Sequence, residues 1–336
     1  MHRDRGWILW RRGKGLSPLE GKICGYLALK DDERIAVRTG SINAGHTVLY
    51  NGIEYRLRMI PCGFVNPKTT LCIAAGANIK VDVLMEEMKL TKVDKRLKID
   101  PQASIIEDEH VQRERSNKYL MEGIGSTGQG VGAAIEDRVK RVAKLARDIE
   151  ELREYLDDVL MIIHEALDSG YNVLLEGTQG YYLSLYHGTY PYVTSRDTTA
   201  SAVCSEVGIG PKMVDEVIVV FKSYVTRVGA GPLPGELTDE EAEKRGLIEM
   251  ATVTRRRRRV APFNFEMAKR AVIANSATQI ALTRIDTLFP AAAKKRRYDE
   301  LPHEAKEFIE EIEDKLKVPV TIISTGPDIQ DTIDLR

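Results

Sequence analysis

One histidine in this sequence has neighbours that suit acid–base chemistry. Asn43-Ala44-Gly45-His46-Thr47 places His46 between a glycine and a hydroxyl residue. Histidine is the side chain that most readily gives or takes a proton near neutral pH. A single histidine is more often structural, so His46 becomes a catalytic candidate only if other reactive segments lie beside it.

Two glycine-rich segments have compositions that suit nucleotide binding. Residues 123–130 contain four glycines and two hydroxyl residues, and the backbone N–H groups of such a loop can hold phosphate. This is not a Walker A loop, because no Lys-Ser or Lys-Thr follows the glycines. Glu176-Gly177-Thr178-Gln179-Gly180 follows an apolar run and offers an amide between two glycines. An ordinary glycine turn is the alternative for this second segment.

Three further segments could contact a nucleoside or its phosphates. Residues 190–199 are rich in hydroxyl groups, which could hold phosphate or ribose or simply cap a helix. Thr283-Arg284-Ile285-Asp286 and Ser324-Thr325-Gly326-Pro327-Asp328 each end an apolar run with an acid. Such a carboxylate could accept hydrogen bonds from a guanine edge, or it could cap a helix.

Five consecutive arginines, residues 255–259, follow Thr252-Val253-Thr254. They could form a solvated charged face, a nucleic-acid contact or a site for small anions, since guanidinium binds carboxylate and phosphate in a planar, bidentate way. No aromatic residues interleave with them, and 49 Lys plus Arg against 50 Asp plus Glu give a net charge of −1. The composition therefore speaks against a nucleic-acid partner.

The remaining composition indicates a folded protein of the cytoplasm. Hydrophobic residues make up 43% of the 336 residues and charged residues 29%, which excludes a disordered or fibrous chain. The four cysteines form no CxxC pair and are too few for a disulfide scaffold. No apolar run approaches the roughly 20 residues needed to cross a bilayer, so we expect no membrane association.

The elements that must position these segments alternate between strands and helices. Apolar β-branched runs predict strands over 71–75, 173–175, 217–221, 280–283 and 320–323, and helical periodicity predicts helices over 83–90, 148–167, 239–245, 263–274 and 304–316. Asn51-Gly52 between two alternating runs predicts a hairpin over 48–60. We therefore expect a single large α/β domain around a mainly parallel central sheet, with its site at the carboxyl ends of the strands.

The order of these motifs along the chain resembles adenylosuccinate synthetase. Asn43 to Thr47, Ser126 to Gly130, Glu176 to Gly180, His187 to Ser195, Thr226-Arg227-Val228-Gly229-Ala230-Gly231-Pro232, Thr254 with the arginines, and Ser324 to Asp328 occur in the family's order. The resemblance spans about residues 21–334, and the chain length resembles the compact archaeal form. It implies an α/β domain with a GTP site like that of P-loop NTPases.

The resemblance implies an activity, its cosubstrates and its assembly. The family joins IMP and L-aspartate into adenylosuccinate and releases GDP and phosphate from GTP, in the first committed step from IMP to AMP. GTP phosphorylates the purine O6 and aspartate displaces that phosphoryl group, with one Mg²⁺ per subunit on the GTP phosphates. The family is a homodimer, and Arg141 matches an arginine that each subunit supplies to the IMP site of its neighbour.

The resemblance also implies a role for each matched residue. His46 matches the general acid, and the carbonyl of Gly45 matches a Mg²⁺ ligand. The matched IMP contacts are Asn43, Ala44, Gly45, His46, Thr127, Arg141, Gln179, Thr194 and Arg256. The matched GTP contacts are Gly45, His46, Thr47, Arg258, Arg284, Ile285, Asp286, Ser324, Thr325 and Gly326. The matched aspartate contacts are Val253, Thr254, Arg255, Arg256, Arg257 and Arg258.

Residues 1–20 depart from the family, whereas residues 21–336 form the matching domain. The family opens with a strand and Gly-Gly-x-x-Gly-Asp-Glu-Gly-Lys-Gly-Lys, whose Asp is catalytic base and Mg²⁺ ligand; here only Gly21-Lys22-Ile23 rejoins the pattern. Lys14 stands between two glycines, but no strand is clearly indicated before it. Smaller departures are Arg255 in place of a glycine and Arg284 in place of a lysine.

A frameshift is one hypothesis for the altered segment. With one choice of codons, the family's loop read from its third base gives Trp-Ile-Leu-Trp-Arg-Arg-Gly-Lys-Gly, the sequence of residues 7–15. The alternative function is a non-catalytic nucleotide-binding relative that has lost its first phosphate loop.

Overall fold

Nine strands form one central sheet in the computed structural model, which describes residues 6–11, 19–250 and 257–336. Neighbouring strands are parallel except at one edge, where β15 is antiparallel to β14. In spatial order they are β15 (Thr332–Asp334), β14 (Val320–Ser324), β13 (Gln279–Thr283), β10 (Glu216–Lys222), β1 (Gly6–Arg11), β9 (Val173–Glu176), β2 (Ile35–Arg38), β5 (Thr70–Ile73) and β7 (Leu97–Ile99). The predicted mainly parallel α/β sheet is confirmed.

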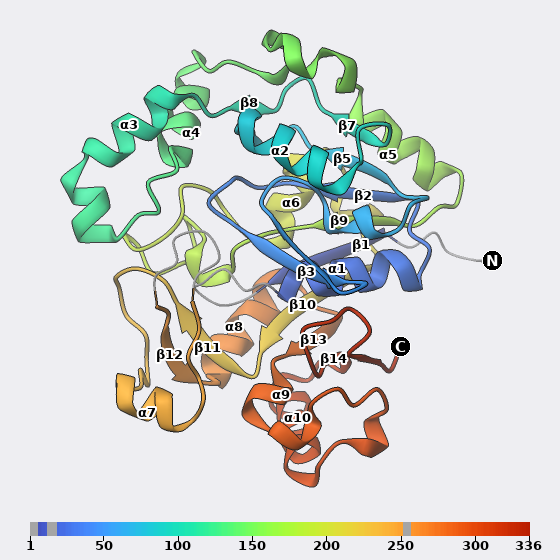
Figure 1. Cartoon of the computed structure of the whole chain (residues 1–336), viewed down its shortest axis with the longest axis vertical. Helices are drawn as coiled ribbons and strands as arrows, with labels where there is room; N and C mark the ends of the chain where they lie inside the picture. The colour runs from blue at the N-terminus through green and yellow to red at the C-terminus, as the bar shows by residue number, and fades with distance from the viewer. Residues whose placement is uncertain (1–5, 12–18, 251–256) are drawn as a thin grey trace.

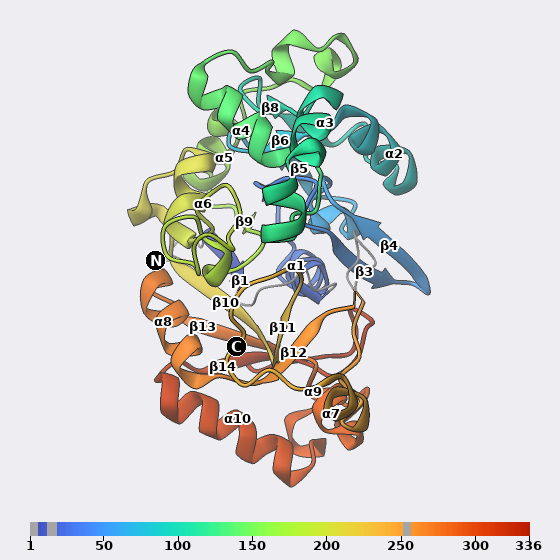
Figure 2. The ribbon, with the colours of Figure 1, turned by 90° about the vertical axis from the view of Figure 1, so that its left-hand side faces the viewer.

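Alternating residues of the strands pack into two separate cores. Ile218 and Val220 of β10 join one apolar cluster, and Val219 and Phe221 join the other. Buried residues of α1 (Leu19–Lys30), α2 (Val81–Thr91) and α4 (Val131–Lys140) belong to the first cluster. Those of α5 (Val159–Asp168), α6 (Ala200–Val207), α8 (Phe265–Asn275) and α10 (His303–Leu316) belong to the second. Figure 2 shows α6 and α8 on one side of the sheet and α1 on the other.

Smaller elements flank the sheet (Figure 1). β3 (His46–Tyr50) and β4 (Ile53–Leu57) form the predicted hairpin, and the positive φ angles of Asn51 and Gly52, 51° and 76°, suit its two-residue turn. The others are β6 (Asn78–Ile79), β8 (Ser104–Ile105), α3 (Asp108–Ser116), β11 (Tyr224–Arg227), α7 (Asp239–Lys244), β12 (Arg259–Pro262) and α9 (Ile285–Leu288). Among the described residues, every helix is too short or too polar to span a lipid bilayer.

Two sequence-based expectations differ from the structure. The single helix predicted over 148–167 is wrong: 3₁₀ turns occupy residues 146–155, and α5 begins only at Val159. The break arises because the Asp157 N–H donates to Ile99 of β7 at 3.0 Å, and the Asp158 side chain caps α5 by accepting from Met161 N. The sequence indicates no clear strand before Lys14, whereas the structure has β1 (Gly6–Arg11) there, in the middle of the sheet.

Candidate functional site

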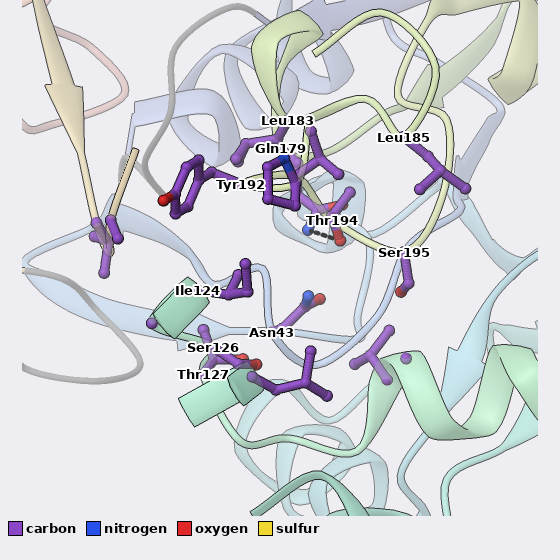
Figure 3. A pocket seen from close by; sticks show the side chains of 18 of the residues that line it. Asn43, Ile124, Ser126, Thr127, Gln179, Leu183, Leu185, Tyr192, Thr194 and Ser195 are labelled. Carbon is purple, nitrogen blue, oxygen red and sulfur yellow. Dashed lines mark hydrogen bonds between the residues drawn. The ribbon is translucent and has the colours of Figure 1, made fainter. Parts of the chain in front are cut away.

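A cavity of about 340 Å³ opens between segments that are far apart in the sequence (Figure 3). Four of its lining residues are polar side chains singled out above: Asn43, Thr127, Gln179 and Thr194. Gln179 Nε2 donates to Thr194 Oγ1 at 2.9 Å, and this bond joins the segment after β9 to the hydroxyl-rich segment. The cavity therefore combines polar groups with an apolar wall that includes Leu183, Leu185 and other aliphatic residues.

Asn43 is held at the cavity by the segment that follows β2. The Arg38 side chain at the end of that strand donates from Nη2 to the Ala44 carbonyl at 3.2 Å and from Nε to the Arg58 carbonyl at 3.2 Å. Asn43 Oδ1 is buried and has no hydrogen-bond partner among the described residues. A buried, unpaired amide oxygen is costly unless something else bonds to it, so a ligand donor fits this position.

The loop before α4 is folded around a carboxylate. Glu114 of α3 accepts from the Ser126 hydroxyl and from the Gly130 N–H, and Arg115 Nε donates to the Gly128 carbonyl at 3.0 Å. Gly130 has φ 77°, and a Cβ there would lie 2.7 Å from Val111 N. These contacts place Thr127 on the cavity wall, ahead of the N-terminus of a helix.

His46 is not among the residues that line the cavity and is buried, with 2% of its surface exposed. Its Nδ1 lies 2.8 Å from Glu176 Oε1, and its Nε2 lies 3.1 Å from the Ile60 carbonyl oxygen. Glu176 also pairs with Arg38, its register partner on β2, and accepts from the Cys62 N–H at 2.8 Å. Both ring nitrogens thus face hydrogen-bond acceptors.

The charge of Glu176 is fixed by its surroundings. Burial disfavours its ionised form, but Arg38 and His46 outweigh burial and lower the pKa of Glu176 to about 2. His46, Cys62 and Glu176 could in principle form a small metal site. The 2.8 Å ion pair between His46 and Glu176, and the further pairing of Glu176 with Arg38, leave that carboxylate fully engaged within the protein.

The two segments expected to read guanine lie side by side. One segment, Arg284 to Asp286, directly follows β13. The other begins with Ser324, the last residue of the neighbouring parallel strand β14, and continues through Thr325 and Gly326. Burial raises the pKa of Asp286, whereas Arg284 opposes that shift. Lys22 of α1 reaches the same place, with its Nζ 2.8 Å from Ser324 Oγ.

The described part of the arginine run is held by acidic partners. Arg257 pairs with Glu243 at 2.9 Å, Arg258 with Glu249 at 3.3 Å, and Arg259 pairs with Glu236. Arg258 is 2% exposed. Residues Val253, Thr254, Arg255 and Arg256, which were expected to bind aspartate or IMP, lie outside the described residues. Where the run is described, its arginines form separate ion pairs rather than an open basic surface.

Arg141 lies apart from the cavity. It follows α4 with φ 65° and is exposed on the surface, next to Val139 and Val142, which are 72% and 69% exposed. It is not among the residues that line the cavity.

Comparison with known proteins decides the family. A sequence model of the family "Adenylosuccinate synthetase" matches residues 20–151, 141–293 and 289–333. The chain belongs to the adenylosuccinate synthetase family. The enzyme of that name from Thermococcus onnurineus is 51% identical over 94% of this chain and 95% of its own length, and that from Methanocaldococcus jannaschii is 52% identical over 94% and 93%.

A solved structure agrees with the sequence relatives. The fully ligated adenylosuccinate synthetase from Plasmodium falciparum superposes with a TM-score of 0.90 and 27% identity, over 99% of this chain and all of that one. The predicted fold and activity are therefore confirmed: this family member is a GTP-dependent ligase that joins IMP and L-aspartate to form adenylosuccinate in purine nucleotide biosynthesis.

Sequence reasoning missed several residues that organise the site. The sequence shows Glu176 only as the start of a glycine-containing loop, and no motif distinguishes Arg38 or Glu114 from other charged residues. Arg38 and Glu176 are the last residues of their strands, and a charged residue ending an apolar run was the available signal.

Proposed function

We propose that the cavity binds IMP through Asn43, Thr127, Gln179 and Thr194. The observation that carries this assignment is their convergence from four separate segments onto one cavity of about 340 Å³. The aliphatic wall suits a purine ring, the unpaired Asn43 oxygen suits a ligand donor, and the glycine-rich loop before α4 suits a phosphate. Ala44, Gly45 and His46 complete the IMP contacts from the segment that Arg38 holds.

His46 acts as the general acid in this proposal. It would protonate or hydrogen-bond the oxygen that becomes negatively charged on the purine, which stabilises the transition state. Its Nε2 now faces the Ile60 carbonyl, so the imidazole must exchange that contact for the substrate oxygen while Glu176 retains Nδ1. Because His46 is buried and does not line the cavity, the ring or the segment that covers it must also move before Nε2 reaches the substrate.

GTP is assigned to the carboxyl ends of β13 and β14. Asp286 would accept from the guanine edge, flanked by Arg284 and Ile285, with Ser324, Thr325 and Gly326 on the neighbouring strand end. Gly45, His46 and Thr47 would face the phosphates. Arg258 would also contact GTP, which requires it to part from Glu249.

The aspartate substrate is assigned to residues 253–258. Their guanidinium groups suit the two carboxylates of L-aspartate. Arg257 and Arg258 are now paired with Glu243 and Glu249, so aspartate must compete with those carboxylates.

Mg²⁺ fits the Gly45 carbonyl by donor chemistry. Magnesium prefers hard oxygen ligands and usually takes several from phosphates and water. The His46, Cys62 and Glu176 cluster fits it poorly, because it offers nitrogen and sulfur donors and its carboxylate is already paired. When bound, the ion neutralises charge on the transferred phosphate.

A second copy of the chain completes the IMP site in this proposal. Among the described residues that line the cavity, Arg227 is the one cation, and its guanidinium already donates from Nε to the Ala230 carbonyl at 2.6 Å. A phosphate dianion next to Glu114 requires positive charge from elsewhere. The exposed Arg141, flanked by two exposed valines, suits a dimer interface that delivers it to the neighbouring cavity. The four cysteines are free and buried, which fits a cytoplasmic enzyme.

The test is product formation with and without repair of residues 1–20. The family model matches from residue 20 onward, which supports a separate, altered N-terminal segment. The chain as written should bind IMP but form adenylosuccinate at least about 10²-fold more slowly than a version whose first 20 residues carry a strand and a Gly-Asp-Glu-Gly-Lys loop, because a missing general base costs about 10²- to 10⁴-fold. Full Mg²⁺-dependent activity in the chain as written would show that another acid serves as base. An inactive repaired chain that fails to bind IMP would refute the site assignment.

A further inference from the structure

The side chain of Lys22 is completely buried, which is rare for a lysine. Its relative exposure is 0%, although lysine is almost never fully buried without partners. It lies in the first turns of α1, the helix that follows β1 and residues 12–18. Lys22 matches the last lysine of the family's first loop, but it is not among the matched IMP, GTP or aspartate contacts named above.

Three acceptors from one loop converge on its ammonium group. Nζ lies 2.8 Å from Ser324 Oγ, 2.7 Å from the Gly326 carbonyl and 2.6 Å from the Asp331 carbonyl. A lysine ammonium has three N–H donors, so each donor has one acceptor. Burial lowers the pKa of Lys22 to about 7, while the carboxylates of Asp331, Asp286 and Asp328 oppose that shift.

The loop that follows β14 is closed around this ammonium. Thr325 N donates to the Asp331 carbonyl at 3.0 Å, and Asp331 N donates to the Asp328 carbonyl at 3.0 Å. Gly326 packs so tightly that a Cβ there would lie 2.5 Å from Asp331 Oδ2. The Asp331 carbonyl also accepts from Thr325 N, and the Gly326 carbonyl from Ser324 Oγ at 3.2 Å. Removing Lys22 would therefore take one donor from each of these buried carbonyls and break the link between this loop and α1.

We propose that Lys22 is a positioning residue for the guanine nucleotide: it shapes the Ser324–Gly326 loop as one wall of the guanine pocket and ties that wall to α1. This inference rests on the proposed assignment of GTP to the ends of β13 and β14. The proposal implies that Lys22 influences the affinity and base preference for the guanine nucleotide without contacting the nucleotide. IMP binding should not depend on Lys22.

The experiment measures binding of GDP, ADP and IMP to the full chain by calorimetry, with IMP saturating for the two nucleoside diphosphates. Lys22→Met keeps the length of the side chain and removes its donors. We expect at least a tenfold loss of GDP affinity, a smaller preference for GDP over ADP, and IMP affinity within threefold of the parent. Lys30→Met, the same substitution at the exposed end of the same helix, should change none of these.

Two further variants distinguish a failure of the proposal for Lys22 from a failure of the GTP-site assignment. Lys22→Gln retains two donors on a shorter side chain and should fall between parent and Lys22→Met. Asp286→Asn tests the guanine site itself, and unchanged GDP affinity and base preference there would refute the nucleotide assignment together with this inference. If Asp286→Asn weakens GDP binding but Lys22→Met does not, only the role of Lys22 is refuted. Equal losses of GDP and IMP affinity, or loss of IMP binding in both Lys22 variants, would assign the lysine to general folding and overturn the proposal.

Discussion

Glu176→Gln should destabilise the protein by about 3 kcal/mol at pH 7. A pKa lowered from 4.5 to about 2 means that the folded state favours the carboxylate by about 3 kcal/mol, because each pKa unit corresponds to about 1.4 kcal/mol. Since the folded-state pKa is the lower one, this stability is fully present above pH 4.5 and is lost as the pH falls toward 2. Removing one partner of a buried ion pair typically costs about 3–5 kcal/mol, which is consistent with this value.

The same substitution should also impair catalysis more than IMP binding. An amide has one acceptor oxygen, whereas the carboxylate serves Arg38, His46 and the Cys62 N–H with two. The glutamine NH₂ must then face one of these donors, and His46 loses its fixed orientation. We expect turnover of the repaired chain to fall at least about 10²-fold, the effect of disabling a general acid, with little change in the IMP dissociation constant.

Urea denaturation at pH 7 and steady-state kinetics provide the two measurements. Glu54→Gln is the matched control, because Glu54 also pairs with an arginine, Arg56, but both side chains are about half exposed. Exposed pairs contribute about 0–1 kcal/mol, so the control should be nearly neutral. A Glu176→Gln protein within 1 kcal/mol of the parent, or one with normal turnover, would refute the reasoning.

Three other predictions address the acid, the assembly and a buried carboxyl. His46→Ala in the repaired chain should lower turnover by about 10²-fold or more with IMP affinity little changed, and near-normal turnover would remove His46 from the mechanism. In the repaired chain, mixed dimers of the Arg141→Leu and Gln179→Ala variants should regain activity through hybrid sites, so subunits that exchange without recovery would exclude a shared site. Burial, and secondarily Asp31, raise the pKa of Glu33 to about 8, so folding binds a proton between pH 4.5 and 8 and stability falls as pH rises through that window. The free energy of unfolding of Glu33→Gln should therefore equal that of the parent near pH 4.5. Above pH 8 the variant should be more stable by at most about 5 kcal/mol. Parallel curves of stability against pH for the two chains would contradict this prediction.

Long, uniformly apolar strands were predictable, and strands without that pattern were not. The runs around Val219 and Ile322 are β-branched, and both faces of the sheet are covered, so their pattern indicates a parallel sheet directly. β2 has four residues and ends in Arg38, and β1 has arginine at one end and a glycine at the other. Neither strand shows an alternation of apolar and polar residues, so only their pairing with neighbouring strands in the structure identifies them as strands.

The order of motifs could be read from the chain, but the contacts between motifs could not. His46 and Glu176 are distant in sequence and meet only because β2 and β9 are adjacent. Lys22 and Ser324 come from opposite ends of the chain, and no local pattern pairs them. Sequence reasoning therefore indicated which residues carry the chemistry, whereas the structure shows which residues hold them in place.

The central position of β1 has a consequence for synthesis of the chain. β1 precedes the other described strands in the chain, yet its partners are residues 173–176 of β9 and 216–220 of β10. β1 therefore cannot pair with β9 until residue 176 has been made, and its other edge stays open until residue 220 has been made. Open edges of this kind favour aggregation, and pairings between such distant residues form slowly. Early segments of the polypeptide are therefore exposed to aggregation until the later strands have been made.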